Sequence, residues 1–224
     1  MATSERDILS DRSVAVRSRG SVYLLLSRLF SREVDDALLE WLGSEETLST
    51  LASLEVDTAP FAACKVAGDS REKGELLEGL DEEYAALFIL PGGLSPYESV
   101  QLKGQHCQEP EWKVRQFYLK CGLVVKEETK IFADHIGAEL GFMAYLAEKE
   151  ADALESDDGE GAVQWQESQS GFFGSHLGCW AFGFLDEMER LTTHPFYREV
   201  ALLTRNFLRS ENEELAPPET EAEA

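Results

Sequence analysis

Asp134 and His135 form an adjacent pair whose side chains could act in acid–base catalysis or bind a metal ion. They stand near the start of the most strongly periodic helical segment. Neighbouring helical residues point about 100° apart, and helical metal sites use spacings such as i, i+4, so this pair needs further ligands to hold an ion. We expect Asp134 to accept hydrogen bonds from first-turn N–H groups and His135 to bond to a neighbouring loop. A small helical metal-dependent hydrolase using Asp134 and His135 stays open as the alternative.

Other reactive side chains form no recognisable catalytic motif. His106 precedes Cys107, but a nucleophile and its base need a spatial geometry that adjacency does not provide. The four cysteines include no C-x-x-C pair, which argues against zinc-ribbon and redox motifs. The stretch "LPGGL" lacks the lysine and Ser/Thr of a phosphate-binding loop. These residues therefore complete no known motif for catalysis, for a metal ion or for a cofactor.

The stretch "LFILPGGLSPYESV", residues 87–100, joins the end of a helix to a stiff loop. Pro91 and the glycine pair after it end the helix, and Pro96 favours an extended chain. An apolar helix end beside an extended segment can form one wall of a groove for an apolar peptide. Tyr97 would add a stacking face and Glu98 a carboxylate that attracts cations.

Apolar residues recur at helical spacing along most of the chain, and no segment shows sustained strand-like alternation. Pro110 suits a first helical turn, while Gly43 and Gly122 suit helix ends. The segment from Gly43 to about Gly68 is weakly patterned, and we expect residues 155–164 to be a solvated linker. The pattern predicts an all-α, single-domain helical bundle. The predicted stripes are Val22, Leu25, Leu26, Leu29, Phe30; Val34, Leu38, Leu42; Leu76, Leu80, Tyr84, Leu87, Phe88; Val114, Phe117, Tyr118; Phe132, Ile136, Leu140, Met143, Ala147; Leu177, Trp180, Ala181, Phe184, Leu185, Met188; and Tyr197, Val200, Ala201, Thr204, Leu208.

Composition and charge narrow the class of partner. The 224 residues are 43% hydrophobic, which is enough for a sizeable core, so we expect one helical domain at 1–209. Residues 210–224 are acidic and proline-bearing, and we expect a disordered tail. The net charge of −23 argues against nucleic acid and anionic membrane surfaces. No segment is long and apolar enough for a signal peptide or membrane span, so the expected location is the cytoplasm.

Several motifs together resemble the TorD/DmsD/NarJ family of redox-enzyme maturation chaperones in their order and spacing. They are Tyr84-x-x-Leu87-Phe88-x-x-Pro91; Pro96-Tyr97-Glu98-Ser99-Val100; Asp134-His135-Ile136; and Glu139-Leu140 with Phe142-Met143. "YLLLSRLF" and "HLGCWAFGFLDEMERLTTHPFYREVA" are similar to the family's first and last helices, so the resemblance spans nearly the whole chain up to the tail. The chain departs from the family pattern at Ile131, where members often have an acid, and at Ala133, where they often have a proline or acid.

The resemblance implies a TorD-like fold and a non-catalytic cytoplasmic chaperone. Such a protein binds the twin-arginine signal peptide or N-terminal segment of an apo-form molybdenum oxidoreductase catalytic subunit, and holds it for cofactor insertion before export or assembly. The resemblance also implies a set of peptide-binding residues, carried over by position. They are Tyr84, Leu87, Phe88, Pro91, Pro96, Tyr97, Glu98, Ser99, Asp134 and His135.

Two questions stay open at the level of sequence. A purely structural subunit of a larger complex would also be helical and non-catalytic, but it would co-purify with a stable partner. The protein could be a monomer or a helix-swapped dimer, with the segment from Ser156 to Gly161 as the hinge. The identity of the client enzyme, and any binding of nucleotide or molybdenum cofactor, does not follow from these residues.

Overall fold

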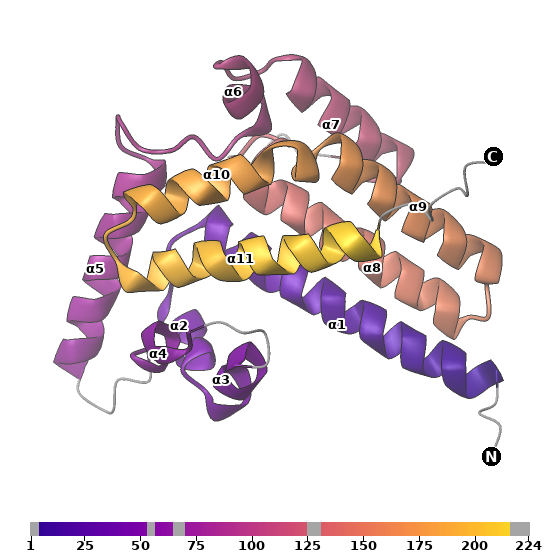
Figure 1. The fold of residues 1–224 in the computed structure, drawn as a ribbon, viewed down its shortest axis with the longest axis horizontal. Helices are drawn as coiled ribbons and strands as arrows, with labels where there is room; N and C mark the ends of the chain where they lie inside the picture. Colours follow the sequence, from indigo (N-terminus) through magenta and orange to yellow (C-terminus); the bar gives the residue numbers. More distant parts are fainter. Residues whose placement is uncertain (1–4, 53–56, 65–69, 125–130, 216–224) are drawn as a thin grey trace, which may run out of the picture.

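The computed structural model describes residues 5–52, 57–64, 70–124 and 131–215, and these form eleven α-helices and no strand (Figure 1). The all-α prediction is therefore confirmed. No helix in the described part of the chain is both long and apolar enough to cross a membrane. The helices are α1 (Glu5–Ser31), α2 (Asp36–Leu42), α3 (Glu45–Ala52), α4 (Ala59–Ala62), α5 (Ser70–Phe88), α6 (Glu98–Lys103), α7 (Glu109–Lys120), α8 (Ile136–Glu155), α9 (Gly159–Ser175), α10 (Leu177–Leu191) and α11 (Pro195–Glu214).

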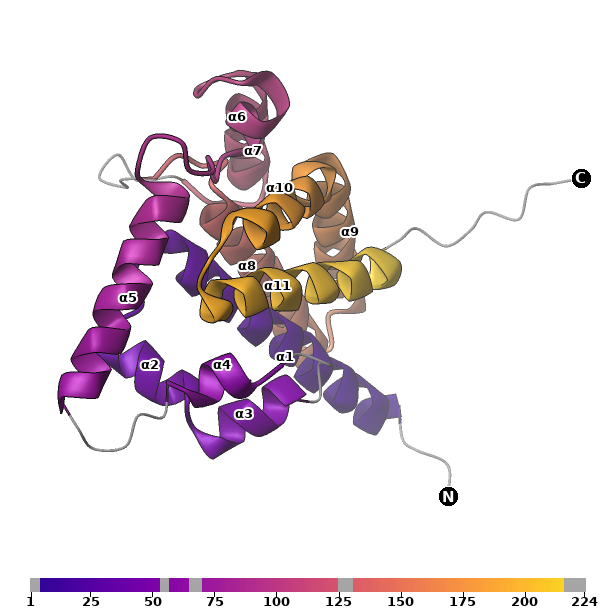
Figure 2. The same cartoon turned by 60° about the vertical axis from the view of Figure 1, so that its left-hand side comes forward.

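The long helices α1 and α8 run against each other through the middle of the molecule in both views (Figures 1 and 2). Small residues allow this close approach: a Cβ added at Gly20 of α1 would lie 3.4 Å from the Cβ of Ala147 on α8. Ser27 Oγ donates a hydrogen bond to the carbonyl of Gly137 at 2.6 Å. Helix α8 buries residues on nearly every side and lies at the centre of the fold.

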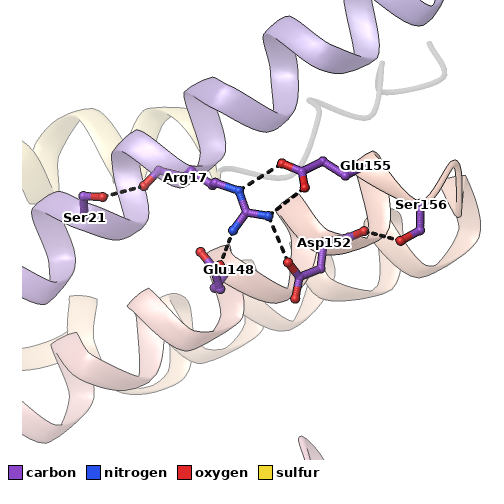
Figure 3. A network of polar contacts seen from close by, with 6 residues as sticks. All are labelled: Arg17, Ser21, Glu148, Asp152, Glu155 and Ser156. Carbon is purple, nitrogen blue, oxygen red and sulfur yellow. Dashed lines mark hydrogen bonds and ion pairs between the residues drawn. The ribbon is translucent and has the colours of Figure 1, made fainter.

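Arg17 joins the outer halves of the same two helices (Figure 3). Glu148, Asp152 and Glu155 share one face of α8, at i, i+4 and i+7. Arg17 Nη2 lies 3.0 Å from Asp152 Oδ1 and 2.9 Å from Glu155 Oε2, and Arg17 Nη1 also pairs with Glu148. The network is solvent-exposed, so it orients the helices more than it stabilises them.

Helices α9, α10 and α11 pack over this pair, and α5 stands at the other end of the molecule near α2 and α4 (Figures 1 and 2). Every position of the stripes predicted at 177–188 and 197–208 is buried, which confirms both helices. Pro110 lies in the first turn of α7, as predicted, and Gly122 follows that helix with φ +82°. Gly43 directly follows α2, also as predicted, although its backbone is right-handed.

Several short or polar helices differ from the prediction. The weakly patterned region before Gly68 contains α3 and α4, and the expected extended loop after Pro96 turns into α6 at once. The expected linker at 155–164 is wrong. Only residues 156–158 separate α8 from α9, and the Asp158 side chain accepts a hydrogen bond from Gly161 N at 2.9 Å, which offsets the weak helix propensity of the glycines.

The chain end also differs from the expected division at residue 209. Helix α11 continues to Glu214, because Glu211 is 3% exposed and pairs with Arg19 at 3.1 Å. Leu215 is buried after it, and its carbonyl accepts a hydrogen bond from Ser170 Oγ at 2.7 Å. The start of the expected tail therefore lies within the packed helix, while 216–224 fall outside the described residues.

Candidate functional site

Two of the sequence motifs, which begin at Pro96 and Asp134, lie side by side in the structure. Tyr97 and His135 form an isolated antiparallel bridge. On either side of it, Glu98 N donates to the carbonyl of Asp134 at 2.9 Å and Ile136 N donates to the carbonyl of Pro96 at 2.9 Å. Backbone pairing thus fixes the start of α6 against the start of α8.

The side chains of Asp134 and His135 reinforce this junction, with roles that differ from the expected ones. Asp134 Oδ2 accepts from Ser99 N at 2.9 Å, so it caps α6 and not its own helix. His135 Nδ1 accepts from Gly137 N at 3.0 Å and is itself the N-cap of α8. Burial lowers the pKa of His135 to about 4, which keeps the ring neutral and able to accept.

This geometry does not support the hydrolase alternative. Asp134 and His135 direct their acceptors to two different backbone N–H groups, and both residues are buried. In the described part of the chain, no group of three or more histidine, cysteine, aspartate or glutamate side chains is placed to hold a metal ion. Asp134 and His135 therefore serve as structural residues that cap α6 and α8.

The end of α5 is held by a tight turn that requires a glycine. Leu94 N donates to the carbonyl of Leu87 at 2.6 Å, and Gly92 has φ +95°. A Cβ at Gly93 would lie 2.5 Å from the carbonyl oxygens of Ala86 and Leu87. The two glycines thus have separate tasks, one conformational and one steric.

The residues expected to bind a peptide differ in exposure. Pro91 is exposed, and Phe88 and Tyr97 are partly buried. The others are buried: Tyr84, Leu87, Pro96, Glu98, Ser99, Asp134 and His135. Direct contact with a partner at this surface is thus open to only three of the ten, while the buried ones position them.

Two large apolar residues that sequence reasoning missed lie beside the exposed Pro91. Ile89 is 61% exposed and Leu90 is 56% exposed, directly before Pro91. Phe88 packs inward against the rings of Phe30 and Tyr84, with centroids 6.2 and 5.1 Å away. We call residues 88–91 the α5 apolar end.

Aromatic rings surround Tyr97, which follows this end by six residues. The centroid of Tyr97 lies 4.8 Å from His106, 5.8 Å from Phe132 and 5.0 Å from His135. Phe132 was predicted on the α8 stripe, but it precedes the helix and is 39% exposed, because residues 134–136 pair with the Pro96 segment and α8 begins only at Ile136. His106 packs against Tyr97, so its presence requires no catalytic pairing with the adjacent Cys107.

Buried polar groups lie beneath this junction. Glu98 pairs with His176 Nδ1 at 3.0 Å, and Glu139 accepts from Trp180 Nε1 at 3.1 Å. Burial raises the pKa of Glu139 well above its usual range, and the carboxylates of Glu98 and Asp134 raise it further. Nothing in the local sequence around His176 points to Glu98, which is 78 residues away.

The structure also has two hollows away from these motifs. One, of about 770 Å³, lies between α1, α3 and α11 and is lined in part by Val22, Leu203 and Phe207. A smaller one, of about 340 Å³, lies near Arg12 and Glu150, where α1, α8, α9 and α11 meet. The larger hollow is a second surface that a peptide binding experiment must distinguish from the α5 apolar end.

Comparisons with known proteins give a family and named relatives. Residues 31–186 match the family model "Nitrate reductase delta subunit", which is more than half of the chain. The chain is 28% identical over 214 residues to "Chaperone protein TorD" of Shewanella pealeana, covering 87% of this chain and 88% of the relative. It is 29% identical over 143 residues to "Probable Tat proofreading chaperone DmsD" of Haemophilus influenzae, covering 59% of this chain and 60% of the relative.

Proposed function

The chain belongs to the nitrate reductase delta subunit family, and on that premise we propose that it is a maturation chaperone for a molybdenum-cofactor oxidoreductase. It binds the twin-arginine signal peptide or N-terminal segment of the apo-form catalytic subunit in the cytoplasm. It holds the subunit for cofactor insertion before export or assembly. Binding and release of a peptide suffice for this task, so the protein needs no catalytic residue.

The α5 apolar end is the proposed contact for the apolar part of the peptide. Ile89 and Leu90 expose most of their side chains at neighbouring positions, although this does nothing to stabilise the fold. Their backbone is held by the Gly93 turn, so little conformational entropy is lost when a peptide binds. This rigid exposure is the observation that carries the proposal.

The partly buried ring of Tyr97, with Phe132 and His106 around it, extends the proposed contact surface. Aromatic faces accept apolar and cationic side chains alike. The buried members of the expected set, such as Asp134 and Ser99, hold this surface in place through the junction of α6 with α8. Their proposed contribution to peptide binding is therefore indirect.

Calorimetric titration tests the function directly. The full chain is titrated with synthetic twin-arginine signal peptides of molybdoenzymes encoded beside it, each next to its twin-lysine variant. Saturable binding that selects one peptide supports the proposal and names the client. If no peptide binds, and the protein instead co-purifies permanently with a partner, the structural-subunit alternative takes its place.

A variant pair then tests the surface. Ile89→Ser with Leu90→Ser removes exposed apolar area at the α5 apolar end without touching the core, so peptide affinity falls while unfolding is unchanged. Val14→Ser with Leu24→Ser is the matched control, since these α1 residues are 61% and 62% exposed. Equal affinities for the two variants would assign the peptide to another surface.

The oligomeric state is a further part of the proposal. A monomer fits the short turn at 156–158, because exchanging helices through it would require the capped start of α9 to open. Light scattering with and without peptide measures the molar mass and so tests the monomer.

A further inference from the structure

The outer face of α7 combines exposed apolar side chains with positive charge. Trp112 is 59% exposed and Leu119 is 50% exposed. They are seven residues apart, which places them on one side of the helix and about 10 Å apart along its axis, with Gln116 between them. Figure 1 shows α7 at the upper edge of the molecule. We call Trp112, Gln116 and Leu119 the α7 outer stripe.

The inner face of α7 fixes the orientation of this stripe. Val114 is fully buried, and Tyr118 Oη donates to the carbonyl of Ala133 at 2.9 Å. The ring of Phe117 packs against that of Phe172, with centroids 5.2 Å apart. These contacts hold the helix by its other side, so the exposed tryptophan and leucine cannot turn into the core. An exposed tryptophan with a second apolar residue beside it is typical of a binding surface.

Cations border the α7 outer stripe on both sides. Lys113 and Lys120 each follow one of its apolar residues by one position and form a parallel row, and Arg115 lies on the opposite border. Lys113 pairs with Glu109 at 2.7 Å, and Arg115 pairs with Glu111, whose side chain is only 11% exposed. Among the residues that the structure describes, Lys120 takes part in no ion pair. The border therefore presents more positive than negative charge to a partner.

This positive charge is local, and it contrasts with the rest of the chain. Residues 101–124 contain four basic and two acidic side chains, whereas the whole chain has a net charge of −23. The arginines of α1 also form a basic stretch, but carboxylates of other helices neutralise them, as when Arg17 pairs with α8 and Arg19 with Glu211. The outer face of α7 is thus a place where an acidic ligand meets attraction on an acidic protein.

We propose that the α7 outer stripe binds an amphipathic helix whose apolar side chains are bordered by glutamate or aspartate. A helix that lies along another helix presents apolar residues at i, i+3 or i+4, and i+7, which matches the spacing of about 10 Å from Trp112 to Leu119. Its carboxylates reach the lysine row on one side and Arg115 on the other. The charge of this partner is opposite to that of a twin-arginine peptide, so the surface adds a second binding activity to the proposed function.

Titration with two synthetic helical peptides tests this surface. Both carry leucines at i, i+3 and i+7, bordered by glutamates in one peptide and by lysines at the same positions in the other. The net charge of −23 attracts the lysine peptide, so a preference for the glutamate peptide requires a local positive surface. At low ionic strength the wild type binds the glutamate peptide about tenfold more tightly, as three exposed charge pairs allow.

A pair of charge variants tests the lysine row. Lys113→Gln with Lys120→Gln reduces the preference for the glutamate peptide to about threefold or less, because only Arg115 remains at the border. Arg32→Gln with Arg190→Gln is the matched control, since both side chains are 65% exposed and pair with carboxylates near them in sequence, and it keeps the tenfold preference.

A pair of apolar variants tests the stripe itself. Trp112→Ser with Leu119→Ser weakens binding of the glutamate peptide by at least about tenfold, because the apolar contact is lost. The Val14→Ser, Leu24→Ser variant removes apolar side chains of similar exposure from α1 and binds this peptide as the wild type does. Thermal unfolding checks that both variants fold. Both also bind the twin-arginine peptide unchanged, so this inference and the proposed function stand or fall separately.

Several results would overturn the proposal. If neither peptide binds, or the lysine peptide binds as tightly as the glutamate peptide, the overall charge decides and α7 has no such partner. If the Lys113/Lys120 variant keeps the full preference, the peptide binds elsewhere. A wild-type dimer in light scattering that dissociates in the Trp112/Leu119 variant would make a second copy the occupant. Sedimentation with phosphatidylglycerol vesicles that requires the lysine row would make it an anionic membrane.

Discussion

Gly93→Ala tests whether the turn after α5 is as tightly built as the structure indicates. The added Cβ would lie 2.5 Å from two backbone carbonyl oxygens, those of Ala86 and Leu87, and neither can rotate away as a side chain would. The turn must open, which breaks the 2.6 Å hydrogen bond from Leu94 N to Leu87. The α5 apolar end then loses its fixed position.

The magnitude follows from these two effects. Overpacking of this kind costs about 1–3 kcal/mol, and a lost hydrogen bond adds about 1 kcal/mol, so unfolding becomes easier by about 2–4 kcal/mol. For a chain of this length, Tm falls by about 2–4 °C per kcal/mol, which gives a shift of about 10 °C. Peptide affinity falls as well, because the binding surface is no longer preorganised.

Thermal unfolding followed by circular dichroism measures the shift against two other glycines. Gly92→Ala meets no neighbouring atom but keeps a positive φ, so it costs only about 1–2 kcal/mol. Gly79→Ala lies inside α5 in open space and stabilises the protein by about 0.5–1 kcal/mol. Wild-type stability in the Gly93 variant would refute the steric argument and the preorganised turn with it.

Three further predictions follow from the junction and the core. His135→Asn keeps an N-cap acceptor but removes the titrating ring. Because burial lowers the pKa of His135 in the folded state to about 4, the unfolded wild type takes up a proton first, and its free energy of unfolding falls by about 3 kcal/mol relative to the variant between about pH 6.5 and about pH 4. Urea unfolding measures this, and parallel stability curves for the two proteins across that range would contradict it. Asp134→Asn still accepts from Ser99 N, so both stability and peptide affinity in titrations stay within about a factor of two in equilibrium constant, whereas loss of binding in a folded variant would make Asp134 a direct contact. Iodoacetamide at pH 8 modifies exposed Cys107 but not Cys64, whose pKa is raised by burial to about 11, and mass spectrometry showing equal labelling would place Cys64 at the surface.

Helices with a long apolar stripe were predictable, whereas α9, with few apolar positions and a polar one in its core, was not. The stripes of α10, and of α11 as far as Leu208, can be read directly because each inward residue there is apolar or threonine. Helix α9 buries Gln169, which donates to Glu150 at 2.8 Å and accepts from Arg19 at 2.6 Å. Such a residue interrupts the stripe, and only its distant partners make its burial favourable.

The adjacency of the two sequence motifs was predictable, but the role of each residue in their junction was not. The resemblance to the family placed Pro96–Glu98 and Asp134–His135 in one expected site, and backbone pairing does join these two segments. Local sequence could not reveal that Asp134 caps α6, because its partner Ser99 is 35 residues away. The four consecutive apolar residues 87–90 were a usable signal, since one helical face cannot bury all of them.

Amide hydrogen exchange of the full chain, with and without a saturating twin-arginine signal peptide, tests the central claim most directly. The account predicts slower exchange at 88–97 and in α6, by up to about a hundredfold when the peptide is present at about 100 times its Kd. Slowing confined to α1 and α11 around the hollow of about 770 Å³, with 88–97 unchanged, would contradict the account and move the binding site to that face.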